Sequence, residues 1–252
     1  MSGPALVRGE LVKVLSTRLW LGMLIGVVAF TALQVVAQIF GSGQQPGSAG
    51  ITSDAGVRNV YSSAGASYVL VLVLGILGMT QEFRHMTVTS TFLAEPRRIH
   101  VVIAKMFAHA LIGAAFALVA LSIGFGLSAV LLGTKEHAPI ASSTLWQIAG
   151  GVILGFVLYT VLGVAFGALV RNQIAAILIA IVWVLLVEAL VVAFLPAVGK
   201  WLPGGAMNGL LQATGFNNAT YLAPLAAAAL LLAYCLGLAA IAAATTLRSD
   251  IT

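Results

Sequence analysis

Residues 82–105 read EFRHMTVTSTFLAEPRRIHVVIAK and form a long polar interval with clustered cations between two apolar runs. The interval holds two of the 4 histidines and four of the 12 Lys and Arg residues, namely Arg84, Arg97, Arg98 and Lys105. A basic segment between membrane spans is expected on the cytoplasmic side. Apolar residues at helical spacing in 84–94, followed by Pro96, predict a short amphipathic helix along the inner membrane face and then a basic turn. An ordinary cytoplasmic loop is the alternative.

The composition of the whole chain is that of an integral membrane protein. Hydrophobic residues make up 61% and charged residues only 8%, whereas roughly a quarter of the residues in soluble domains are charged. The net charge of +5 does not indicate nucleic-acid binding, because the cations flank apolar runs, where they set topology. The single cysteine, Cys235, lies inside an apolar run and can form no intrachain disulfide.

The apolar runs predict an all-α, polytopic fold with six transmembrane helices in one domain, residues 1–252. Each run is long enough to cross the ~30 Å hydrocarbon core. The predicted spans are 20–40, 61–80, 106–132, 145–170, 173–195 and 221–247. Residues 1–19 carry an apolar helical stripe and predict an N-terminal interfacial helix, with disorder as the alternative. Residues 200–220 are apolar but interrupted by Pro203, Gly204 and Gly205, which predicts a broken extracellular helix before the sixth span.

The distribution of cations predicts the orientation. Six spans place both termini on one side, and we expect that side to be the cytoplasm. Nine of the 12 Lys and Arg residues are then inside: Arg8, Lys13, Arg18, Arg84, Arg97, Arg98, Lys105, Arg171 and Arg248. The remaining three, Arg58, Lys135 and Lys200, are outside, in agreement with the positive-inside rule.

Several catalytic patterns are missing from the sequence. It contains no GxxxxGK[ST] phosphate loop, no HExxH and no Cys/His cluster, which argues against nucleotide hydrolysis and zinc chemistry. No GxSxG accompanies His109, the one histidine deep enough to serve a serine hydrolase. We therefore expect a non-enzymatic chain with no cofactor of its own.

Glu188 is the one acidic or basic residue inside a predicted span. A carboxylate in hydrocarbon is costly unless it is neutralised or paired, so it should face the bundle interior or a cavity. Gln34 and Gln38 have a comparable depth in the first span, and either is a candidate partner. The pattern leaves three roles open for Glu188: a structural or cavity-lining role, direct substrate contact, and proton coupling.

The polar interval also carries a family resemblance. Its residues Glu82, Arg84, His85, Thr87, Thr91, Leu93, Pro96, Arg97, Arg98, Ala104 and Lys105 resemble the loop between the second and third spans of ABC-2 type transporter permeases. Met86 stands where that family frequently has Gly, and the arginines follow Pro96 more closely than is usual. The N-terminal helix, the six spans and the broken outer helix extend the resemblance over nearly the whole chain.

This resemblance implies a permease subunit of an ATP-driven exporter, with a coupling segment at 82–105. The residues expected to couple to the ATPase are Glu82, Arg84, His85, Thr87, Thr91, Phe92, Arg97 and Arg98. The partners implied are ATP-binding cassette ATPase subunits, which bind the ATP and Mg, and a second permease, with a homodimer preferred over a heterodimer. No nucleic-acid partner is expected.

The expected cargo is an amphipathic or lipophilic substrate, such as a drug, an antibiotic or a lipid, that leaves through the cell inner or plasma membrane. The resemblance implies a path between the two copies that is lined by the first, second and fifth spans, with Gln34, Gln38 and Glu188 as candidate path residues. The alternatives are a nucleotide-independent secondary transporter and a non-catalytic scaffold subunit.

Overall fold

The computed structural model describes residues 3–44, 49–84, 98–214 and 220–245, and these residues are mostly helical with no β-strand among them. Six helices in the described chain are long and apolar enough to cross a membrane. Their bounds are Leu19–Gly41, Asp54–Arg84, His100–Leu132, Ser142–Val170, Gln173–Phe194 and Pro224–Ala244. The all-α class and the multi-pass membrane character predicted from the sequence are thus confirmed.

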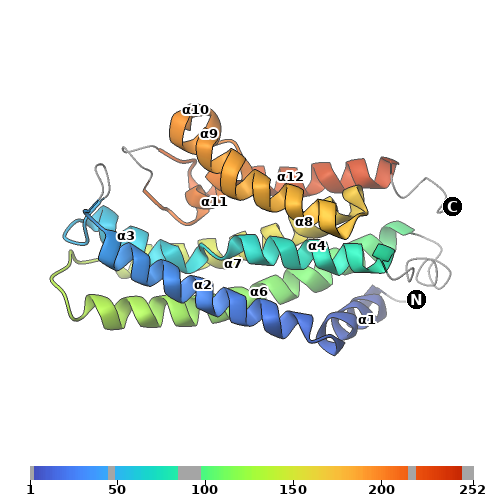
Figure 1. The fold of residues 1–252 in the computed structure, drawn as a ribbon, viewed down its shortest axis with the longest axis horizontal. Coiled ribbons are helices and arrows are strands. Elements are labelled where there is room, and N and C mark those ends of the chain that lie inside the picture. The colour runs from blue at the N-terminus through green and yellow to red at the C-terminus, as the bar shows by residue number, and fades with distance from the viewer. Residues whose placement is uncertain (1–2, 45–48, 85–97, 215–219, 246–252) are drawn as a thin grey trace.

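The elements form a bundle around two central helices (Figure 1). In chain order they are α1 Gly3–Ser16, α2 Leu19–Gly41, α3 Asp54–Ser62, the 3₁₀ turn η1 Ser63–Gly65, α4 Tyr68–Arg84, α6 Arg98–Leu132, α7 Ser142–Val170, α8 Gln173–Val182, the π-helical turn η2 Trp183–Glu188, α9 Ala189–Phe194, α10 Pro196–Gly199, α11 Pro203–Leu210 and α12 Pro224–Thr245. In the apolar stretches of the α3–α4 and α7 spans, 78% and 67% of the residues are buried, whereas the corresponding shares for α2, α8–α9 and α12 are 17–22%. The outer helices therefore present apolar faces suited to lipid or to another protein.

Glycines bring the two central helices unusually close together. A Cβ on Gly163 of α7 would lie 2.2 Å from the carbonyl oxygen of Leu72 in α4. A Cβ on Gly75 of α4 would likewise lie 2.1 Å from the carbonyl oxygen of Thr160. Small residues that allow backbones to touch are a recurrent basis of helix association in membranes. By contrast, a Cβ on Gly22 of α2 would have no described neighbour within 4 Å, and one on Gly26 would make an ordinary contact of 3.5 Å with Leu70.

The second span begins earlier than the sequence predicted. We expected a polar loop up to residue 59 and a span from 61, but α3 begins at Asp54. Ser53 caps it, because its hydroxyl accepts a hydrogen bond from the Gly56 N–H at 3.2 Å. The buried Val57 and Val60 lie on one face of α3, so the tertiary packing of a short amphipathic helix outweighs its polar composition.

The third helix also begins earlier than expected. Helix α6 starts at Arg98, so residues 98–105 are helical, whereas we predicted a basic turn there. The residues 85–94 of the predicted coupling helix lie outside the described residues.

The fifth span is interrupted and then folds back. Helix α8 passes into the π-helical turn η2, which ends at Glu188, and α9 ends at Phe194 before Pro196. The short helices α10 and α11 follow, each with a proline in its first turn, where proline is tolerated. The predicted broken helix thus corresponds to α11. The last helix, α12, begins at Pro224, slightly later than predicted.

Candidate functional site

Four charged side chains meet where α1, the end of α4 and the start of α6 come together. Lys13 Nζ lies 2.6 Å from Glu10 Oε1 and 2.8 Å from Glu82 Oε1. Lys105 Nζ lies 3.1 Å from Glu82 Oε1 and also pairs with Glu10 Oε2. Two carboxylates and two ammonium groups therefore alternate in a closed set, which we call the charge ring (Glu10, Lys13, Glu82 and Lys105).

The charge ring is largely shielded from solvent. Lys105 is 2%, Glu10 5% and Glu82 7% exposed, whereas the Lys13 side chain is 49% exposed and forms the edge that faces water. Buried ions are tolerated when each charge is paired and hydrogen-bonded. The set has no net charge, so the cost of burying each ion is offset by two partners of opposite sign.

Burial and pairing act in opposite directions on the pKa values of the α1 groups. Burial by itself raises the pKa of Glu10, but the charges and hydrogen bonds of Lys105 and Lys13 hold that pKa below its ordinary value of 4.5. Burial alone lowers the pKa of Lys13, but Glu10 and Glu82 raise it above 10.5. Both groups of α1 are consequently charged at neutral pH.

The charge ring joins the two ends of the polar segment 82–105. Glu82 lies at its first residue and Lys105 at its last, and the salt bridge between them closes the base of residues 82–105. The i, i+3 spacing of Glu10 and Lys13 places both on the same face of α1. Leu11 of α1 also packs against the main apolar core. Helix α1 is thus held to the C-terminal end of α4 and to the N-terminal part of α6.

His109 lies one turn beyond Lys105 and is fully buried. Its Nδ1 is 2.9 Å from the carbonyl oxygen of Lys105, which can only accept, so Nδ1 carries the proton. Its Nε2 has no hydrogen-bond partner among the described residues. The ring sits directly on Gly78 of α4, where a Cβ would lie 1.7 Å from Nε2. His109 therefore packs α6 against α4 just beyond the charge ring.

Among the residues predicted to couple to the ATPase, Glu82 and Arg84 are described together with their side-chain partners. Glu82 belongs to the charge ring, and Arg84 Nη1 donates to Gln173 Oε1 of α8 at 3.3 Å. Arg98 is the first residue of α6. The predicted residues His85, Thr87, Thr91, Phe92 and Arg97 lie outside the described residues.

At the opposite end of the bundle, the two predicted glutamines line a cavity of about 410 Å³. Gln34 and Gln38 of α2 share it with Asn59 of α3, Leu185 of η2 and Asn208 of α11. The cavity therefore brings residues of the first, second and fifth spans together around several amide side chains. Amides offer both donors and acceptors without a charge, which suits a neutral polar group.

Glu188 does not contact either glutamine. Its Oε1 accepts a hydrogen bond from Trp183 Nε1 at 2.6 Å, and its Oε2 accepts one from the Gly204 N–H at 2.5 Å. The expected partner of this carboxylate is thus corrected: depth along a helix does not specify the direction in which a side chain points. Glu188 instead ties the π-helical turn of the fifth span to the first turn of α11.

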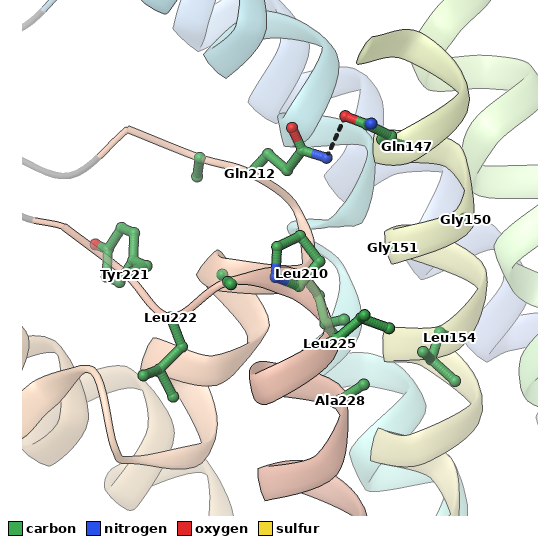
Figure 2. A pocket seen from close by; sticks show the side chains of 14 residues that line it. Gln147, Gly150, Gly151, Leu154, Leu210, Gln212, Tyr221, Leu222, Leu225 and Ala228 are labelled. Atoms are coloured by element: carbon green, nitrogen blue, oxygen red, sulfur yellow. Dashed lines mark hydrogen bonds between the residues drawn. The ribbon is translucent and has the colours of Figure 1, made fainter. Parts of the chain in front are cut away.

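A hollow of about 750 Å³ lies where α7, α11 and the start of α12 meet. Figure 2 shows Gln212 reaching Gln147 across its mouth, with a hydrogen bond of 3.0 Å between the two side chains. Leu154 and Leu225 line its wall (Figure 2). Its lining contains no charged side chain.

The contribution of α1 to the site was not predicted from the sequence. Glu10 and Lys13 had a detectable signal, since they are opposite charges on one helical face. Lys105 was recognised as part of the motif but not as a site residue. Within the described ranges, no three His, Cys, Asp or Glu side chains gather closely enough to hold a metal ion. No protein-family model matches the chain, and a comparison with curated proteins finds no match.

Proposed function

We propose that this chain is the membrane-spanning permease subunit of an ATP-driven exporter of the ABC-2 type. It works in this proposal with a second copy of itself and with separate ATP-binding cassette subunits, which bind the ATP and Mg. The end of the bundle that holds α1 faces the cytoplasm of the cell inner or plasma membrane, with both termini on that side. An amphipathic or lipophilic molecule is moved outward.

The observation that carries this proposal is the charge ring. A segment that receives force from an ATPase must be joined rigidly to the spans that it moves, because a loose loop would absorb the displacement. Here the salt bridge between Glu82 and Lys105 closes the base of residues 82–105, and α1 braces both ends. A push on the segment is therefore passed to α4 and α6 together, as a rigid-body change requires.

The cavity around Gln34 and Gln38 supports a path through the outer half of the bundle. Its lining includes residues of the first and second spans and Leu185 of the fifth, the spans that the family resemblance implies, together with α11 and residues that follow it. The poorly buried faces of α2 and α8–α9 suit a second copy of the chain across that path. The largely apolar spans suit a lipophilic cargo.

The test is purification of the tagged chain from its own membranes, followed by reconstitution into vesicles. We expect a stoichiometric ATP-binding cassette subunit and export that requires Mg-ATP. Arg84→Ala should leave assembly intact but reduce the transport obtained per ATP hydrolysed. Arg18→Ala is the matched control, because Arg18 and Arg84 are both exposed cations. Equal coupling in both variants would count against the role of Arg84.

A nucleotide-independent secondary transporter is the alternative, and Glu188 is the observation that favours it. A carboxylate inside a span is a common element of proton-driven transport. Transport that follows an imposed proton gradient without ATP, and that disappears in Glu188→Gln, would establish this alternative and refute the exporter.

A further inference from the structure

Glu188 lies in the wall of a second cavity, about 290 Å³, that is separate from the one around Gln34. Residues of α4, α7, the fifth span and α12 surround it. Its lining is predominantly apolar: Leu72, Tyr159, Leu162, Phe166, Ile179, Ala180, Trp183, Val184, Leu202, Pro203, Tyr234 and Leu238. A site of this size holding one acidic group has the features of a small-molecule pocket, where few polar groups set orientation and an apolar wall supplies contact area.

The negative charge of Glu188 has no counter-ion in the part of the chain that the structure describes. Its two oxygens accept one N–H each, from Trp183 and Gly204, and none of the ion pairs between described residues includes it. Each of these hydrogen bonds stabilises the ionised carboxylate, because both oxygens accept and neither has to donate. Neutral donors do not cancel the charge, and Glu188 is only 2% exposed. An uncompensated buried charge calls for a cation from elsewhere.

The aromatic rings beside Glu188 suit a cation that has an organic body. Trp183, Tyr159, Tyr234 and Phe166 all line the cavity, and the faces of such rings attract ammonium groups in a desolvated site. The Tyr159 hydroxyl is buried and has no hydrogen-bond partner among the described residues. It is thus a second polar group in the same wall, and its hydrogen-bonding capacity is not used by the described residues.

The rim of this cavity lies on the outer surface of the bundle. Ile179 and Trp183 are 50% and 45% exposed, although both line the cavity, so they form its rim. Both belong to the fifth span, one of the least buried in the molecule. A ligand that enters here must partition into lipid first, which selects for lipophilic molecules.

We propose that this cavity binds a lipophilic organic cation, such as a quaternary or protonated amine with an apolar body, with its charge against Glu188 and its body against the aromatic wall. The inference names a substrate class for the proposed exporter and rests on that function for its role in transport. The binding itself requires no ATPase.

The experiment measures equilibrium binding of tritiated benzyltrimethylammonium to the purified chain in lipid nanodiscs, with protein-free nanodiscs as the blank. Neopentylbenzene, its uncharged carbon analogue of the same shape, is measured in parallel. We expect Glu188→Gln to weaken binding of the cation at least about tenfold and to leave binding of the uncharged analogue unchanged. Glu136→Gln, an exposed acidic residue, is the matched control and should bind both probes as the wild type does.

Two results would overturn the proposal: unchanged binding of the cation by Glu188→Gln, or an equal loss of both probes. If Glu188→Gln does not assemble, Ala180→Leu provides the second variant. Ala180 is buried in the cavity wall, so the larger side chain should abolish binding of both probes, and unchanged binding of the cation would again overturn the proposal. These results leave the exporter proposal untouched, because that proposal is tested by the ATP dependence of transport.

Discussion

Removing the central cation of the charge ring tests how strongly α1 is held to the bundle. In Lys105→Met the side chain keeps its length but loses its charge, and Glu10 and Glu82 are left with Lys13 alone. At an effective dielectric constant of about 20, the 3.1 Å pair between Lys105 and Glu82 is worth about 5 kcal/mol. The pair with Glu10 adds to this, while the desolvation cost of Lys105, several kcal/mol, is recovered. We expect a net destabilisation of about 3–5 kcal/mol.

The assay is thermal unfolding of the purified protein in detergent, followed by tryptophan fluorescence. For a chain of this length, the loss corresponds to a fall in Tm of about 6–20 °C. Lys135→Met is the control, because Lys135 is exposed and its one cation–π contact, 4.5 Å from the Phe40 ring, is worth no more than about 1 kcal/mol. Adding Glu10→Gln to Lys105→Met should restore part of the Tm, since it restores a neutral set of charges. Equal Tm values for the two lysine variants would refute the reasoning.

Three further predictions concern single contacts, and each is tested by the same measurement of Tm. Because the pKa of Glu10 is lowered in the folded state, its ionisation stabilises the fold above the ordinary pKa of 4.5, and this stabilisation is lost as pH falls through the lower folded value. The Tm difference between wild type and Glu10→Gln should therefore be constant near neutrality and shrink below pH 4.5. A Tm difference that does not depend on pH would contradict this prediction. Gly204→Ala places a Cβ 2.3 Å from the carboxylate of the fifth span and should cost about 1–3 kcal/mol through the lost hydrogen bond, whereas Gly150→Ala, with open space at its Cβ, should not destabilise. In Gly78→Ala the added Cβ would overlap the imidazole of His109, so this variant should have a lower Tm than Gly150→Ala. Equal Tm values for the two variants would contradict the close packing of His109 on Gly78.

The parts of the fold that were predictable are those encoded within one turn or one span of sequence. The six apolar runs correspond to six long helices, because the requirement for about 20 apolar residues is local. Pro203 and Pro224 are the first residues of α11 and α12, where the preset backbone angle of proline fits the first turn. The start of α3 at Asp54 was missed because its hydrophobic residues are buried by other segments, which no window of its own sequence records.

The composition and order of residues therefore determined that this is a multi-pass helical membrane chain, and they singled out 82–105 and Glu188 as unusual. Only the tertiary structure decided the partners. Glu10 meets Lys105 across 95 positions of sequence, and Glu188 meets Gly204 where a glutamine of the first span had been expected. The physical reason is that hydropathy sets the depth of a residue in the membrane, whereas the packing of helices sets the direction in which its side chain points.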